Sequence, residues 1–136
     1  MADANLTAAE LAGLIDHAVL RPETTGEELA AACRLARQWK PASVCVRPCD
    51  VSAAVELLLG SGVPVGTVVA FPHGSAATAL KADEARRALA DGAQELDMVI
   101  NVGLLRDGRM DAVRDDVAAV VAAAGGRTVK VILECC

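Results

Sequence analysis

The chain has 136 residues, of which 54% are apolar and only 1% aromatic, and its formal net charge is −5. An apolar content this high excludes intrinsic disorder, and a chain of this length can bury a substantial core. The acidic balance argues against binding to nucleic acid or a membrane surface, because both require clustered lysine and arginine.

Cysteine usage and the absence of export signals favour a cytoplasmic protein. The opening residues, MADANLTAAE, lack the basic and apolar regions of a signal peptide, and no apolar run reaches the roughly 18 residues of a membrane span. The five cysteines are odd in number and are not spaced like a disulfide framework. Cys45 and Cys49 form a C-x3-C pair, but no second Cys or His pair completes a zinc site, so we expect no metal.

Apolar runs alternate with helical repeats along the chain. An apolar run within residues 11–20 predicts a first strand, closed by Pro22, and residues 24–40 predict a helix with a threonine cap. A second strand is expected at 42–48, followed by a helix at 50–62 that Asp50 caps and a glycine ends. The remaining predicted elements are a strand at 63–72, a helix at 75–93, a strand at 95–101, a helix at 109–126 and a strand at 128–133.

This order gives four strand–helix units and a fifth strand, which predicts a parallel α/β sheet, either doubly wound or a barrel. The strands are nearly uniformly apolar, as expected when both faces are covered. A doubly wound nucleotide-binding fold should carry a glycine-rich phosphate loop after its first strand. The sequence there, HAVLRPETT, has no glycine before Gly26, which disfavours dinucleotide binding.

Polar side chains on the predicted strands favour the barrel. Asp16 lies on the first strand, Cys45 on the second, Asp97 on the fourth and Lys130 on the fifth. Barrels place functional side chains at the C-terminal ends of several strands. Charges on apolar strands are costly unless they meet in a polar pocket, so we expect these residues to share one.

Asp97 and Lys130 are the candidate catalytic residues, and the pattern leaves two interpretations open for each. Asp97 is either a structural partner for a lysine or a general acid–base group with a shifted pKa. Lys130 is either an amine whose pKa is lowered by desolvation, or a strand-end lysine whose ammonium reaches solvent. Opposite charges on adjacent strands favour a shared site.

The other polar residues near these strands carry weaker signals. Asp16 is expected either to hydrogen-bond into the same pocket or to cap the turn before Pro22. His73, in the loop after the third strand, and Glu134, after the fifth, are expected at the surface. Cys45 has no base beside it in the sequence and is expected to line a pocket rather than to act as a nucleophile.

Five motifs resemble, in order and spacing, those of the deoxyribose-phosphate aldolase family: IDHAVLRPETT, ASVCVRP, GTVVAFPHG, GAQELDMVIN and VKVILE. The resemblance implies a cytoplasmic TIM barrel that usually forms homo-oligomers. It also implies a class I aldolase whose substrate is a sugar phosphate and which uses no cofactor or metal. Such an enzyme reversibly cleaves 2-deoxy-D-ribose 5-phosphate into D-glyceraldehyde 3-phosphate and acetaldehyde through a lysine Schiff base.

The resemblance also implies roles for individual residues. Asp97 matches the family's catalytic aspartate, which relays protons around the carbinolamine and enamine. Lys130 matches a fifth-strand lysine that lies in the pocket but is not the Schiff-base nucleophile. Cys45 and Phe71 match pocket-lining positions, and Asp16 matches a first-strand aspartate near the substrate.

A TIM barrel needs about eight strands, whereas residues 1–136 predict five strands of a single partial domain. By the resemblance, the Schiff-base lysine would lie on a sixth strand, a lysine that tunes it on the seventh, and the phosphate-binding loops near the end. Cys135 also stands where the family commonly has threonine. Because five strands cannot close, we expect exposed sheet edges, and the alternative function is an inactive barrel fragment that oligomerises or binds a partner.

Overall fold

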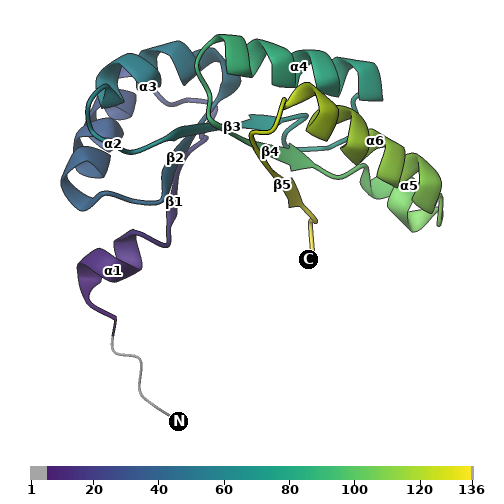
Figure 1. Cartoon of the computed structure of the whole chain (residues 1–136), viewed down its shortest axis with the longest axis horizontal. Coiled ribbons are helices and arrows are strands. Elements are labelled where there is room, and N and C mark those ends of the chain that lie inside the picture. The colour runs from purple at the N-terminus through teal and green to yellow at the C-terminus, as the bar shows by residue number, and fades with distance from the viewer. Residues whose placement is uncertain (1–5, 136) are drawn as a thin grey trace.

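The computed structural model describes residues 6–135 as a five-stranded sheet with helices covering one side (Figure 1). The strands are β1 (Asp16–Val19), β2 (Ser43–Val46), β3 (Val65–Val69), β4 (Glu95–Val99) and β5 (Thr128–Ile132). The helices are α1 (Ala8–Ala12), α2 (Gly26–Trp39), α3 (Val51–Leu58), α4 (Thr78–Ala90), α5 (Val102–Arg106) and α6 (Met110–Ala123), with a 3-10 turn η1 (Pro48–Asp50).

The strands pair in chain order, β1-β2-β3-β4-β5, and every pair is parallel. This confirms the predicted alternation of five strands with four longer helices. The inner strands β2 and β3 are buried along their whole length, whereas the outer strands β1 and β5 are partly exposed. Within the described residues, each outer strand therefore has a neighbour on one side only.

The two faces of the sheet carry different side chains. Residues such as Val46 on β2 and Leu96 and Met98 on β4 belong to the hydrophobic core that also contains residues of α2, α3, α4 and α6. Successive side chains on a strand point to opposite faces, so Asp97 points away from this core. We call the side of the sheet opposite the helices the open face.

Helix α2 begins as the sequence predicts. The Thr25 hydroxyl accepts a hydrogen bond from the Glu28 backbone N–H at 3.3 Å, and the Glu28 carboxylate accepts one from the Thr25 N–H at 2.7 Å. This reciprocal pair satisfies two N–H groups that the first helical turn leaves free. The predicted threonine cap is confirmed.

Three local features differ from the sequence prediction. The five-residue helices α1 and α5 were not predicted, because each is too short to show a helical repeat. Asp50 does not cap α3: its carboxylate forms an ion pair with Arg47 at 2.6 Å, and a 3-10 turn leads into the helix instead.

No helix within residues 6–135 is long and apolar enough to cross a membrane.

Candidate active site

Lys130 lies at the centre of a charged cluster on the open face. Its ammonium nitrogen is 2.5 Å from Oδ2 of Asp16 on β1, and 3.2 Å from both Oε2 of Glu95 and Oδ1 of Asp97 on β4. Asp97 and Lys130 are direct register partners on adjacent strands. We call these four residues the Lys130 cluster. Three carboxylates thus surround one ammonium group, as the sequence predicted in part.

The surroundings of Lys130 favour its charged form. Burial works against the ammonium, but the hydrogen bond with Asp16 and the nearby carboxylates of Asp97 and Glu95 outweigh it, so the pKa of Lys130 rises above its usual 10.5. The structure therefore contradicts the interpretation in which desolvation lowers the pKa of this amine. At neutral pH Lys130 is a cation and not a nucleophile.

Asp16 takes the first of its two open interpretations. Its Oδ1 accepts a hydrogen bond from the Ser43 hydroxyl at 2.7 Å, while Oδ2 accepts one from Lys130. The bond from Lys130, followed by the bond from Ser43, lowers the pKa of Asp16 below its usual 3.8. Asp16 therefore belongs to the cluster and does not cap the turn before Pro22.

Asp97 and Cys45 form the buried wall of the site. Oδ1 of Asp97 is buried and has no hydrogen-bond partner among residues 6–135, since its approach to Lys130 meets an ion-pair distance but not hydrogen-bond geometry. Burial and the nearby charge of Asp97 raise the pKa of Cys45 to about 12. A thiol with that pKa stays protonated at neutral pH, so Cys45 is suited to lining the site rather than attacking a substrate.

The remaining predicted residues lie at the margins of the site. Phe71 follows β3 and is 43% exposed, and its pocket-lining role stays a prediction. His73 and Glu134 are both exposed, as expected. Among residues 6–135, no group of three or more His, Cys, Asp or Glu side chains is placed to hold a metal ion.

Sequence reasoning missed two members of the site. Ser43, which is fully buried, and Glu95 are the first residues of β2 and β4. A polar residue at the start of a strand resembles an ordinary solvated end. Their spacing was the available signal. Ser43 lies two positions before Cys45, and Glu95 lies two positions before Asp97. Each therefore points to the same face of the sheet as that predicted site residue.

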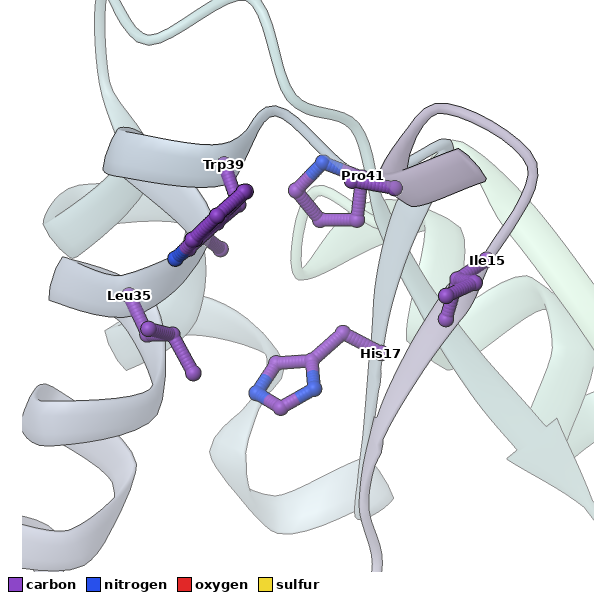
Figure 2. Close-up of a pocket in the computed structure, with 7 residues that line it drawn as sticks. Ile15, His17, Leu35, Trp39 and Pro41 are labelled. Atoms are coloured by element: carbon purple, nitrogen blue, oxygen red, sulfur yellow. The ribbon is translucent and has the colours of Figure 1, made fainter. Parts of the chain in front are cut away.

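A separate apolar cavity of about 320 Å³ lies on the helix side of β1 (Figure 2). Its lining residues are Ala12, Ile15, His17, Leu35, Ala36, Trp39 and Pro41. His17 follows Asp16 on β1, so the two side chains point to opposite faces of the sheet. Nε2 of His17 is buried without a hydrogen-bond partner among the described residues. This cavity is therefore not part of the Lys130 cluster.

Comparison with known proteins links the chain to aldolases. The sequence profile of DeoC/LacD family aldolases matches residues 11–136. The deoxyribose-phosphate aldolase of Staphylococcus epidermidis is 50% identical over 123 residues, which cover 90% of this chain and 56% of the relative. The deoxyribose-phosphate aldolase of Clostridium kluyveri is 48% identical over 128 residues, 93% of this chain and 59% of the relative. The chain thus spans little more than half the length of the curated relatives it matches.

Solved structures show the same relationship in the fold. A crystal structure from Coccidioides immitis matches with a TM-score of 0.91 and 41% identity, covering 95% of this chain and 51% of the other. The tetrameric deoxyribose phosphate aldolase of Aeropyrum pernix matches with a TM-score of 0.86 and 32% identity. The match covers 94% of this chain and 54% of the other. These matches confirm the predicted α/β fold of the TIM-barrel type, here with five parallel strands. By its sequence and its fold, the chain belongs to the DeoC/LacD family of aldolases.

Proposed function

We propose that this chain supplies the acid–base part of a deoxyribose-phosphate aldolase. The proposed reaction is the reversible cleavage of 2-deoxy-D-ribose 5-phosphate into D-glyceraldehyde 3-phosphate and acetaldehyde through a lysine Schiff base. The names of the relatives support this substrate. The observation that carries the proposal is the unpartnered Oδ1 of Asp97, held 3.2 Å from a charged lysine on the open face.

Asp97 is the proposed proton-transfer group. Aldol cleavage requires removal of a proton from a hydroxyl and later protonation of an enamine carbon, and one positioned carboxyl can serve both steps. Oδ1 of Asp97 accepts no hydrogen bond from the described residues, so its lone pairs are not committed to another donor and can accept the substrate's proton in the proposed reaction. Lys130 holds this carboxylate in place and offsets its negative charge, because its own pKa keeps it protonated.

The other cluster residues have proposed roles in shaping the pocket. Asp16 anchors the far side of Lys130 and offers a carboxylate to substrate hydroxyl groups. Cys45 and Phe71 supply apolar walls, one buried and one at the rim.

The Schiff-base lysine is proposed to lie outside these 136 residues. The sequence contains three lysines, and each of them is already engaged. Lys40 donates a hydrogen bond to the Ser61 carbonyl at 2.7 Å, Lys81 is fully buried in an ion pair with Asp116, and Lys130 faces three carboxylates. None of them is an uncommitted amine beside an open acid–base group, which is what Schiff-base formation requires.

Borohydride trapping tests this assignment. The 136-residue chain and a longer polypeptide that contains it are incubated with acetaldehyde and reduced with borohydride. The mass of each intact polypeptide is then measured by mass spectrometry. We expect no adduct on the shorter chain and one on the longer one, whose cleavage rate falls at least about 100-fold in the Asp97→Asn variant. An adduct mapped to Lys130 would refute the nucleophile assignment, and a longer polypeptide without adduct or cleavage would refute the aldolase proposal.

Self-association is the second proposal, either alongside catalysis or as the sole role of an inactive module. The outer strands β1 and β5 each have one unpaired edge within the described residues, and such edges pair readily with another chain. The Aeropyrum pernix relative is tetrameric. We propose a homo-oligomer that works in the cytoplasm, where its free thiols stay reduced. Sedimentation tests it, and a strictly monomeric chain at all concentrations would contradict it.

A further inference from the structure

Lys81 is a fully buried lysine that the proposed reaction does not use. It lies on α4 with 0% of its surface exposed. Its ammonium donates hydrogen bonds to Oδ2 of Asp116 on α6 at 2.6 Å and to the backbone carbonyl of Val99 at 3.0 Å. The Thr78 hydroxyl donates to the other Asp116 oxygen at 2.8 Å. The ammonium therefore joins two helices to the sheet at one point.

Stability alone does not explain this ion pair. Moving two charges out of water carries a large desolvation penalty, and apolar side chains of similar volume often pack in their place without loss of stability. What an apolar pair cannot do is hold a backbone carbonyl. The bond to Val99 is thus the part of the network that has no apolar equivalent.

Val99 is the last residue of β4 and lies two residues after Asp97. The carbonyl that Lys81 holds is therefore at the end of the strand that carries the proposed acid–base group. The same helix is also fastened to the neighbouring strand, because the Glu84 carboxylate accepts a hydrogen bond from the Ala70 N–H, directly after β3, at 2.8 Å. Helix α4 is thus hydrogen-bonded to the ends of two strands, and these two contacts fix the position of Lys81 relative to the sheet.

We propose that Lys81 is a positioning residue for Asp97. Its hydrogen bond to the Val99 carbonyl fixes the end of β4, and this keeps the Asp97 carboxylate at its 3.2 Å separation from Lys130 on the opposite side of the sheet. The importance of this role for catalysis rests on the proposed aldolase function. The role of Lys81 in fixing the geometry of β4 does not depend on that function.

The test combines a double variant with a measurement on Lys130. In Lys81→Met/Asp116→Leu, both buried charges are replaced by apolar groups, so we expect the chain to stay folded, with a lower melting temperature because the Val99 carbonyl loses its donor. The exchange rate of the Lys130 ammonium protons with water is followed by 15N NMR at mildly acidic pH. This rate reports how persistently the ammonium is hydrogen-bonded to the carboxylates around it. We expect exchange to become several-fold faster in the double variant.

Thr78→Val is the matched control, because it removes a hydrogen bond to Asp116 and leaves the bond from Lys81 to Val99 intact. Its Lys130 exchange rate should equal that of the unmodified chain. If the first double variant does not fold, Lys81→Gln/Asp116→Asn gives the same comparison, since the amide pair can hydrogen-bond but is too short to reach Val99. A folded variant with unchanged Lys130 exchange would overturn the proposal. Because no turnover is measured, failure of the aldolase proposal leaves this test unaffected.

Discussion

Lys130 and Asp16 lie on the two outermost strands of the sheet, yet their charged atoms are 2.5 Å apart. In a flat sheet, four spacings of about 4.8 Å would separate these strands by about 19 Å, which the two side chains cannot bridge. The sheet must therefore curl strongly towards its open face. The ion pair between its first and last strands places the other polar residues of that face in one concave site.

Replacing Lys130 with methionine should destabilise the chain, because three carboxylates then face one another without their cation. We expect a loss of about 1 kcal/mol in the free energy of unfolding at neutral pH, a modest value because the side chains are partly exposed to solvent. Urea denaturation measures it. Arg106→Met is the control, since Arg106 is an exposed cation and should change stability by less than about 0.5 kcal/mol. Equal losses in the two variants would contradict the central role of Lys130.

The acid limb of the stability curve should depend on Asp16. Its pKa is lowered in the folded state by Lys130 and then by Ser43, so its contribution to stability is present above the unfolded value of 3.8 and is lost as the pH falls through the folded value. We therefore expect Asp16→Asn to be less stable than the unmodified chain at neutral pH and equally stable in strong acid. Urea midpoints over a pH series measure both curves. Curves that stay parallel through the acid region would show that Asp16 is not coupled to folding.

The sequence was sufficient to predict the strands, the longer helices and the contact between Asp97 and Lys130. Uniform apolar runs mark the strands, and consecutive strands in such a fold are neighbours, so residues on β4 and β5 are expected to meet. The barrel prediction placed Asp16 and Lys130 in one pocket, but their direct contact could not be predicted from neighbouring strands. It joins residues 114 positions apart and depends on how strongly the sheet curls, which no local pattern encodes.

Buried charges were the hardest feature to predict. Lys81 and Asp116 occur on helices whose exposed faces also carry arginine and aspartate, so their charge alone does not distinguish them from solvated residues. Their burial results from the packing of α4 against α6 beside the end of β4. The lowered-pKa interpretation of Lys130 was wrong for a related reason. The sequence placed Asp16 and Asp97 in the same pocket as Lys130 without their distances and missed Glu95, whereas the fold brings all three carboxylates to within 3.2 Å of the ammonium.

Thiol labelling should separate Cys45 from the exposed cysteines. Alkylation requires the thiolate, and burial together with the charge of Asp97 raises the pKa of Cys45 to about 12. We expect iodoacetamide to label Cys49 and Cys135, which are exposed, and to spare Cys45 in the folded chain. Peptide mass spectrometry after a short reaction measures each site, and unfolding in urea should abolish the difference. Labelling of Cys45 as fast as Cys49 in the native state would contradict its buried place in the site.

The loop after β3 should tolerate no side chain at Gly74. A Cβ atom there would lie 2.1 Å from the Ile100 carbonyl oxygen, and the residue has a φ of +66°. Gly74→Ala must therefore push apart the loops that follow β3 and β4, and we expect it to lose about 3 kcal/mol or more.

Gly60→Ala isolates the cause of that loss. Gly60 has a similar φ of +74°, but none of the described residues lies within 4 Å of an added Cβ, so this variant carries the backbone strain alone, about 1 to 2 kcal/mol. The difference between the two urea-unfolding free energies measures the close approach of Gly74 to the end of the Asp97 strand. If both variants lose the same free energy of unfolding, backbone strain accounts for the whole loss in Gly74→Ala. The loops that follow β3 and β4 are then not in contact at Gly74.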